Sequence, residues 1–305
     1  MIQWKGRMLL VTGSEGLIGR HLCKSFESAG VAYRRFDLAR SEQEDVTKIE
    51  SVENAMDGVS GIVHLAAVSR VVWGQQDPAR CISTNVVALK HLLEIAGAQK
   101  SKPWIIFGSS REVYGQAERF PVNEDCPFRP MNVYADTKVA GERLIGRARD
   151  TGLVANICRF SGVFGCVDDH PDRVVPAFAA TAARGGELRI DGSSHVFDFT
   201  HIGDTVRGLH KLVEATASGE RLPPIHFVSG EGTTLGGLAE LAAAHARKPV
   251  TFTEAPPRSF DISGFIGCPE RAAHLLGWRV ATRLSDTFPA LITAMARKWD
   301  AIALD

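Results

Sequence analysis

Tyr134 and Lys138 are the pair of residues whose types and spacing most clearly suggest chemistry. They stand four apart in the stretch NVYADTK, which places both side chains on one face of a helix. A phenol with an ordinary pKa near ~10 is a poor base at neutral pH, but a neighbouring ammonium favours its phenolate form. The pair could therefore move the proton of a substrate hydroxyl. The same spacing also occurs on ordinary helix surfaces, so it needs support from elsewhere in the chain.

Support comes from two serines upstream of this helix. The segment WIIFGSSREVYG ends an apolar, strand-like run at Ser109 and Ser110. A hydroxyl at the end of a strand can hydrogen-bond the oxygen of a reacting group. A serine, a tyrosine and a lysine in this order make a chance explanation poor.

A glycine-rich turn lies near the start of the chain. The apolar run MLLV leads directly into TGSEGLIG, which places Gly13, Gly16 and Gly19 three residues apart between a strand and a helix. Such a turn lets backbone N–H groups and the helix N-terminus approach a pyrophosphate. The sequence therefore predicts a dinucleotide site.

Asp37 ends the next predicted strand, where a carboxylate can accept hydrogen bonds from the adenosine ribose hydroxyls. A negative charge there repels the 2′-phosphate of NADP, so NAD is the expected cofactor. Nearby arginines could accommodate that phosphate and keep NADP open: Arg34, Arg35 and Arg40.

Two further segments are expected beside the dinucleotide. Asp45 and Val46 are expected to follow a third strand, and the segment HLAA is expected to close a fourth with small residues that allow close packing. With Asp37 and the three glycines, the predicted cofactor contacts from these segments are Leu17, Ile18, Asp45, Val46, Leu65, Ala66 and Ala67.

The elements that would position these residues alternate between strand-like and helix-like runs, which predicts βαβ units and a parallel sheet. The predicted fold class is α/β, a Rossmann doubly wound parallel sheet with a smaller mixed α/β C-terminal substrate lobe. We expect the NAD-binding domain to cover 1–165, with 196–230 returning to it. Two segments break the pattern and are assigned to the substrate-binding lobe, 166–195 and 231–305.

Composition narrows the class of partner. The chain has 305 residues with 35 basic and 35 acidic side chains, so nothing suggests a nucleic acid or a membrane surface as partner, and a small-molecule substrate is expected. The opening MIQWKGRMLLVTG is predicted to form a first strand rather than a signal peptide. No metal site is expected, and we predict a cytoplasmic protein with reduced thiols, because the cysteines are scattered: Cys23, Cys81, Cys126, Cys158, Cys166 and Cys268.

Taken together, the motifs resemble the extended short-chain dehydrogenase/reductases, the NAD-dependent epimerase/dehydratase group that modifies nucleotide sugars. The resemblance covers almost the whole chain through TGSEGLIG, HLAA, TNV, SSREVYG, YADTK, RFSGVFG, IDGSSHVFDFTHIGD and LLGW. It implies that Ser110 is the catalytic hydroxyl, Tyr134 the acid/base, and Lys138 the residue that lowers its pKa and holds the nicotinamide ribose. It also implies that Asn85 shapes the nicotinamide end and that Ser161 lies near it.

The resemblance also bears on the reaction. Glu112 stands where dehydratases and decarboxylases of the group carry a glutamate that can abstract a proton. It could equally be a solvent-facing acid at the end of a strand, or belong to the common sequence EVYG without a chemical role. Arg111 occupies a position where some dehydratases have an aspartate, which argues against 4,6-dehydration. Gly162 and Phe197 replace an asparagine and an arginine that usually touch the nucleotide sugar, which counts against a standard UDP-sugar.

Further positions are candidates for binding substrate. Arg258, in PPRSFD, matches a late arginine that contacts the diphosphate in nucleotide-sugar enzymes, and a guanidinium suits that task. Ser69 and Arg70, just past HLAAV, are candidates on the cleft side.

The resulting prediction is an NAD-dependent nucleotide-sugar epimerase, 4-epimerase-like, that transiently oxidises a sugar hydroxyl. Three alternatives stay open. One is an NAD(P)-dependent dehydrogenase or reductase of a sugar, a sugar acid or another secondary alcohol. Another is a dehydratase or decarboxylase that uses Glu112, and the last is a dinucleotide-binding protein without catalysis. By resemblance we expect a homodimer that pairs through helices at 85–98 and 134–149.

Overall fold

The first unit of the fold is a parallel sheet. A computed structural model describes residues 4, 6–256 and 262–302. Six strands run parallel in the order β2-β1-β3-β4-β5-β9. Their bounds are Met8–Thr12 (β1), Tyr33–Phe36 (β2), Val59–His64 (β3), Trp104–Ser110 (β4), Ala155–Phe160 (β5) and Ile225–Phe227 (β9). The predicted parallel sheet is confirmed.

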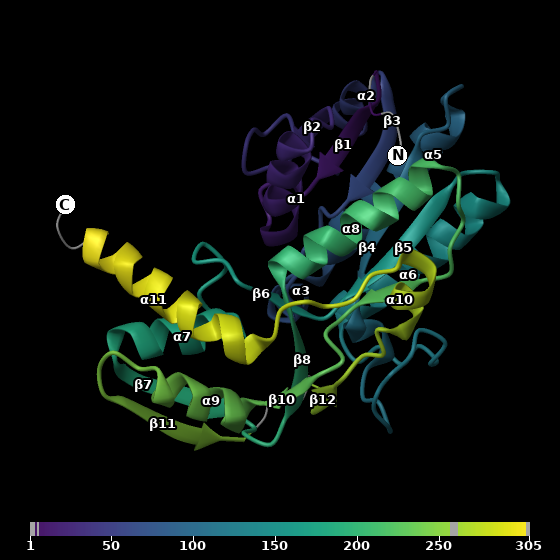
Figure 1. The fold of residues 1–305 in the computed structure, drawn as a ribbon. Helices are drawn as coiled ribbons and strands as arrows, with labels where there is room; N and C mark the ends of the chain where they lie inside the picture. Colours follow the sequence, from purple (N-terminus) through teal and green to yellow (C-terminus); the bar gives the residue numbers. More distant parts are fainter. Residues whose placement is uncertain (1–3, 5, 257–261, 303–305) are drawn as a thin grey trace.

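Helices cover both faces of this sheet, because its central strands are apolar on both sides. Leu9 and Val11 of β1 pack in one core with α1 (Leu17–Ser28) and α8 (Ile202–Ala217). Leu10 points to the opposite face. The helices there are α2 (Ile49–Met56), α5 (Ala88–Ala98) and α6 (Val133–Asp150). Figure 1 shows α8 lying across the sheet.

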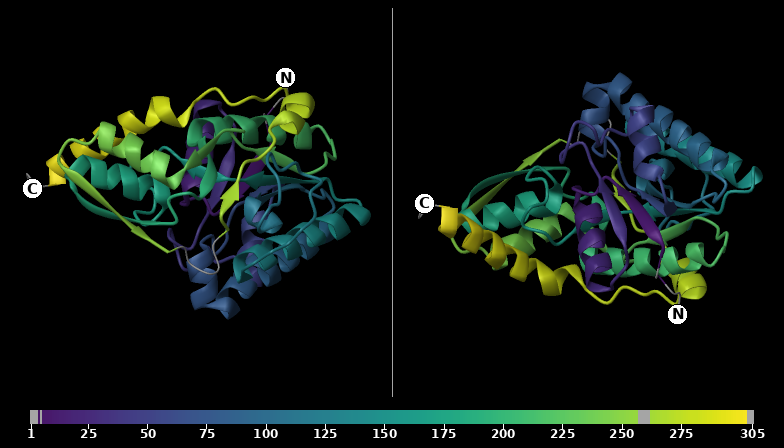
Figure 2. Two further views of the ribbon diagram at one scale, coloured as in Figure 1. Left: turned by 90° about the horizontal axis from the view of Figure 1, so that it is seen from below. Right: turned by 90° about the horizontal axis from the view of Figure 1, so that it is seen from above.

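A second unit lies beside the carboxyl ends of these strands (Figures 1 and 2). In its small sheet β8 (Val196–His201) pairs with β6 (Gly162–Phe164), β10 (Gly232–Thr234) and β12 (Gly264–Phe265). A separate pair joins β7 (Gly186–Asp191) to β11 (Val250–Ala255). An aromatic and aliphatic core joins these strands to α7 (Val174–Arg184), α9 (Leu235–Ala244) and α11 (Leu284–Ile302).

The structure shifts two of the expected boundaries. The return to the first sheet was expected from residue 196, but β8 pairs within the second sheet, and the return begins with α8 and continues to β9. Conversely, α10 (Glu270–Leu276) and the buried Trp278 pack against α8 and the first core. The C-terminal segment after residue 231 therefore serves both units.

The predicted strand before Asp45 is wrong. Between β2 and α2 the chain forms turns, in which the carboxylates of Asp37 and Asp45 accept backbone N–H groups two residues on. The intervening residues ARSEQE are polar, so no strand forms there. The HLAA segment consequently follows the third strand of the chain, β3. In the part of the chain that the structure describes, no helix combines the length and apolarity needed to span a membrane.

Candidate active site

Ser110, Tyr134 and Lys138 meet at the carboxyl edge of the parallel sheet. Ser110 is the last residue of β4, and α6 starts beside it, where the Asn132 side chain accepts the Ala135 N–H at 2.9 Å. Tyr134 and Lys138 are one helical turn apart and both are buried. Lys138 Nζ donates to the Gly108 carbonyl at 2.8 Å and lies 5.7 Å from the centroid of the Tyr134 ring.

Burial dominates the electrostatics of this trio. It raises the pKa of Tyr134 to about 12, although a hydrogen bond with Ser110 lowers that pKa, and the Glu112 charge raises it further. Burial also lowers the pKa of Lys138 to about 8. The lowered tyrosine pKa expected from the lysine is therefore not found in the chain alone, because desolvation of the phenolate outweighs the favourable contacts.

Glu142 and Arg159 form a buried ion pair that was not predicted from the sequence. Glu142 accepts hydrogen bonds from Ser109 Oγ at 2.6 Å and from Arg159 Nε at 2.8 Å and Nη2 at 2.6 Å. Both charged side chains are at most 4% exposed. The signal was available, since Glu142 stands four residues after Lys138 on the same face of α6. The pair fixes α6 against β4 and β5, and so sets the separation of Ser110 from Tyr134.

The glycine turn has the close backbone approach that a dinucleotide site requires. Gly13 has φ +71°, and a Cβ there would lie 2.6 Å from the backbone nitrogen of Ala66. A Cβ on Gly19 would lie 2.1 Å from the Gly13 carbonyl oxygen. No side chain caps α1, whose N-cap is Gly16, so its first N–H groups are available to an anion. These residues fit a pyrophosphate.

Asp37 lies at the end of β2 against this turn. Its carboxylate accepts the Glu15 N–H and the Ala39 N–H, each at 2.9 Å. Arg35 and Arg40 pair with the Glu15 carboxylate at 3.2 and 3.6 Å. Acidic groups thus surround the position where a ribose would meet Asp37, and two of the three nearby arginines are engaged with them.

Arg34 is the third arginine near Asp37, and it points elsewhere. It donates to carbonyl oxygens at the end of α2, including Asn54 at 3.3 Å and Asp57 at 3.2 Å. Each of the three arginines therefore already has partners that a 2′-phosphate would have to displace, which favours NAD.

Asn85 and Ser161 each tie separate segments of the chain together. Asn85 lies in a π-helical turn (Ser83–Val87) and bonds the Val68 N–H at 2.8 Å, while its amide donates to Thr137 of α6 at 2.9 Å. Ser161 Oγ donates to the Asp198 carbonyl at 2.6 Å, which joins the end of β5 to β8. Thr137, three residues after Tyr134, was not predicted.

The remaining predicted cofactor contacts divide into loop and core positions. The segment Leu65, Ala66 and Ala67 leaves β3 beside Gly13 and is partly buried. Leu17 and Ile18 start α1 and pack against the first core. Val46 is buried in the opposite core, and Asp45 holds a turn through Thr47 N at 2.9 Å.

Glu112 and Arg111 follow Ser110 in a short 3-10 turn, Arg111–Tyr114. One oxygen of Glu112 lies 3.4 Å from Arg111 Nη2, and the other accepts Asn132 Nδ2 at 3.3 Å. The Glu112 side chain is 12% exposed, so its interpretation as a solvent-facing acid is wrong.

The residues predicted to bind substrate lie in different environments: Arg70 is held in an ion pair, whereas Ser69 is exposed. Arg70 pairs with Asp172, from the loop that precedes α7, and its guanidinium lies 5.6 Å from the Trp73 ring. Ser69 is exposed. Arg258 lies outside the described residues.

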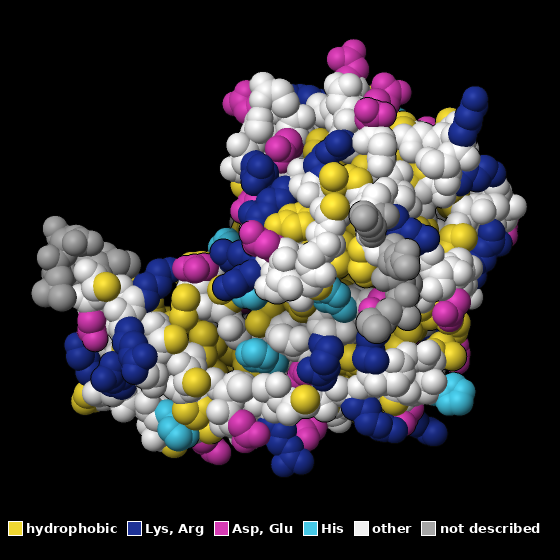
Figure 3. Space-filling model, turned by 45° about the horizontal axis from the view of Figure 1, so that its top comes forward, with side chains coloured by type: hydrophobic (Ala, Val, Ile, Leu, Met, Phe, Trp, Pro, Cys, Tyr) yellow, Lys and Arg dark blue, Asp and Glu magenta, His cyan; other side chains and the backbone are white. Residues whose placement is uncertain are grey.

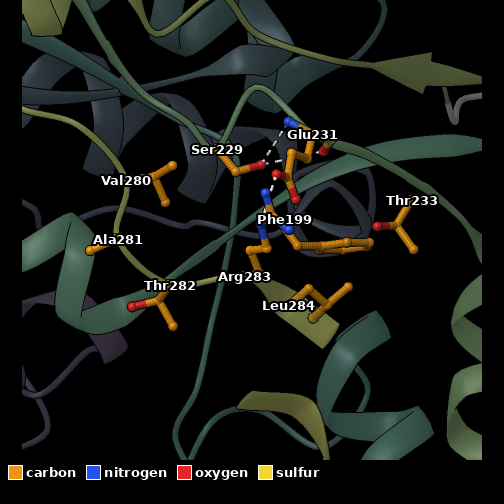
Figure 4. Close-up of a pocket in the computed structure, with 9 residues that line it drawn as sticks. All are labelled: Phe199, Ser229, Glu231, Thr233, Val280, Ala281, Thr282, Arg283 and Leu284. Atoms are coloured by element: carbon orange, nitrogen blue, oxygen red, sulfur yellow. Dashed lines mark hydrogen bonds and ion pairs between the residues drawn. The ribbon is translucent and has the colours of Figure 1, made fainter. Parts of the chain in front are cut away.

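One pocket of the structure does not include Ser110, Tyr134 or Lys138. It lies between β8, the turn before β10 and the segment before α11, where Glu231 faces Ser229 and Arg283 (Figure 4). Figure 3 shows a notch where the two units meet, with histidine and basic side chains along it. Ser110 lies instead on β4, and Tyr134 and Lys138 lie on α6.

Known proteins that resemble this chain in sequence include epimerases and members of an epimerase family. The sequence profile of the NAD dependent epimerase/dehydratase family matches residues 9–227. A UDP-glucose 4-epimerase of Lacticaseibacillus casei is 25% identical over 302 residues, which covers 89% of this chain and 91% of the relative. UDP-glucuronate 4-epimerase 6 of Arabidopsis thaliana is 30% identical over 247 residues, 70% of this chain but only 54% of that longer protein.

Solved structures agree in fold. A UDP-glucose 4-epimerase of Thermotoga maritima, solved with UDP-glucose, aligns with a TM-score of 0.86 at 25% identity and covers 96% of this chain and 99% of its own. A UDP-glucuronic acid 4-epimerase of Bacillus cereus, at 22% identity, has a TM-score of 0.84 over the same shares of the two chains. Because its profile match spans most of the chain, this protein belongs to the NAD dependent epimerase/dehydratase family and is an enzyme of the extended short-chain dehydrogenase/reductase type.

Proposed function

We propose that this protein is an NAD-dependent nucleotide-sugar 4-epimerase. The observation that carries the proposal is the buried trio of Ser110, Tyr134 and Lys138 at the same sheet edge as the glycine turn. Relatives that cover most of the chain bear the names of UDP-glucose and UDP-glucuronate 4-epimerases.

Tyr134 moves the proton in this proposal. As the phenolate, it takes the proton from the sugar hydroxyl, and Ser110, at the end of β4, holds the same oxygen. NAD, which the glycine turn and Asp37 would hold, would supply reversible hydride transfer at the carbon that bears the hydroxyl. Lys138 Nζ donates one hydrogen bond to Gly108 O, and its remaining N–H groups would hold the nicotinamide ribose.

Phenolate formation requires a positive charge near Tyr134, because burial alone keeps the phenol protonated at neutral pH. The Lys138 ammonium supplies one such charge. The Glu142–Arg159 pair acts as a positioning device, since it holds the helix that carries both residues. Asn85 does the same from the other side through Thr137.

NAD is favoured over NADP by the charges around Asp37. Glu15 and Glu44 add to the negative charge of Asp37, and the neighbouring arginines are paired with them. A 2′-phosphate would have to displace these pairs.

Glu112 is assigned a positioning role rather than proton abstraction. Both its oxygens already face donors, Arg111 and Asn132, and Asn132 also caps α6. This arrangement supports epimerisation over dehydration or decarboxylation.

Several further assignments belong to the same proposal. The second unit forms the substrate lobe, and Arg70 and Arg258 contact the nucleotide sugar. The enzyme acts in the cytoplasm as a homodimer that pairs through α5 and α6.

The test is to incubate the purified chain with UDP-glucose or UDP-glucuronate and to identify the products by NMR. We expect a mixture of the two 4-epimers, with no steady accumulation of NADH. The Tyr134→Phe variant, which keeps the ring, should lose turnover but still bind NAD. Steady NADH formation would instead indicate a net dehydrogenase.

A further inference from the structure

We propose that Arg111 binds a carboxylate on the sugar and that the substrate is a nucleotide-linked uronic acid. The inference rests on the proposed function and narrows its substrate class. Arg111 had no binding role in the sequence analysis, where it served only as an argument against dehydration.

The position of Arg111 is unusual for an arginine. It is the first residue after Ser110, and its side chain is only 18% exposed. The guanidinium lies over two rings of the second unit, 4.6 Å from the centroid of Phe197 and 5.8 Å from that of Phe265. The side chain therefore bridges the end of β4 to β8 and β12, across the junction of the two units.

The hydrogen bonding of this guanidinium is incomplete. Nη2 faces Glu112, whereas Nη1 is buried and has no hydrogen-bond partner among the described residues. A buried donor of a charged group without an acceptor is unfavourable, and such donors are normally satisfied by protein, water or ligand. The contacts of the guanidinium with the rings of Phe197 and Phe265 restrict its movement, so the free nitrogen is pre-organised for an acceptor.

The chemistry of that acceptor follows from the place of Arg111. A guanidinium nitrogen favours an anionic oxygen, and carboxylates and phosphates are its usual partners. Arg111 directly follows Ser110, the hydroxyl assigned to the reacting oxygen, so we place Arg111 at the sugar end of the substrate. A carboxylate attached to the sugar ring can reach this end, whereas the diphosphate is separated from the reacting carbon by the ring itself.

Glu112 fits the same assignment. Its carboxylate balances part of the Arg111 charge and is fixed by Asn132, so the guanidinium keeps one orientation without a substrate. An uncharged hydroxymethyl group would bind Nη1 less strongly than a carboxylate, because charge-assisted hydrogen bonds are the stronger ones. The site should therefore discriminate UDP-glucuronate from UDP-glucose.

The experiment compares kcat/KM for UDP-glucuronate and UDP-glucose in the wild-type holoenzyme and in Arg111→Gln. We expect the wild type to prefer UDP-glucuronate by at least about tenfold. Arg111→Gln should lower kcat/KM for UDP-glucuronate by about 10- to 100-fold and change that for UDP-glucose by less than about threefold. Arg111→Lys keeps the positive charge but lacks the planar guanidinium, so its kcat/KM for UDP-glucuronate should lie between those of the wild type and Arg111→Gln. Arg189→Gln is the matched control, an exposed arginine of β7 that pairs with one carboxylate.

Two results would overturn the assignment of Arg111. One is a wild type with equal preference or a preference for UDP-glucose, which needs no variant to fold. The other is a folded, NAD-loaded Arg111→Gln that loses both activities equally. If the wild type epimerises neither compound, the proposed function fails; calorimetric binding of the two compounds then tests Arg111 separately, and a preference for UDP-glucuronate that is lost in Arg111→Gln would support it.

Discussion

Replacing Lys138 by methionine is expected to abolish turnover and at the same time to stabilise the chain at neutral pH. The ammonium is fully buried, and burial lowers its pKa from 10.5 to about 8. At about 1.4 kcal/mol per tenfold change, this fall corresponds to about 3 kcal/mol by which the folded chain disfavours the charged lysine. Methionine keeps most of the apolar stem and removes the charge.

Part of this gain is offset by the hydrogen bond that Lys138 donates to Gly108 O. Losing that bond costs about 1–2 kcal/mol. The free energy of unfolding of Lys138→Met should therefore exceed that of the wild type by about 1–2 kcal/mol near pH 7.5. Functional residues commonly carry such a cost in stability.

The pH dependence gives the sharper test. Between pH 8 and pH 10.5 the unfolded wild-type chain holds a proton on Lys138 that the folded chain has released. The free energy of unfolding of the wild type therefore rises with pH across that window because of Lys138. In Lys138→Met this contribution to the pH dependence is absent. In urea denaturation of both chains, freed of dinucleotide, the advantage of Lys138→Met at pH 7.5 should be lost by pH 10, because wild-type stability rises by about 2 kcal/mol over that range. If Lys138→Met were less stable than the wild type at pH 7.5, and if the difference in free energy of unfolding did not change with pH, burial of the charged lysine would not be the cost inferred above.

Three other substitutions test the rest of the site. Gly13→Ala should abolish NAD binding, measured by calorimetry, because its Cβ would meet the Ala66 nitrogen at 2.6 Å in a backbone conformation that disfavours side chains; binding within about threefold of wild type would contradict this. Asp37→Asn should weaken NAD binding by about tenfold and reduce the preference for NAD over NADP; an unchanged ratio of the two affinities would count against the ribose contact. Glu142→Gln should destabilise the chain by about 3–5 kcal/mol in urea, because it leaves Arg159 buried without its counter-charge; Arg159→Met added to Glu142→Gln should recover part of that loss, and a further loss would argue against the pair.

Much of the fold could be predicted from local patterns. The apolar runs at 8–12, 59–64 and 104–110 are buried on both faces and read as strands wherever they occur. The expected strand before Asp45 failed because turn-forming carboxylates bind the backbone there. The placement of β8 and α10 could not be read locally, since strand pairing and helix packing across units depend on contacts distant in sequence.

The candidate site divides in the same way. Tyr134 and Lys138 are one turn apart on one helix, so their proximity is local. The contact of Glu142 with Arg159 joins α6 to β5, and the contact of Arg111 with the Phe197 ring joins the turn after β4 to β8. Such contacts need the tertiary fold, as does the burial that raises the pKa of Tyr134 against the sequence-based expectation.

Deuterium labelling at C4 of UDP-glucuronate tests most directly whether a retained cofactor transiently oxidises the nucleotide sugar. If it does, the 4-epimer keeps the deuterium at C4, with catalytic rather than stoichiometric NAD present and no net NADH. Loss of the label to solvent, or a yield of NADH equal to the product, would contradict it.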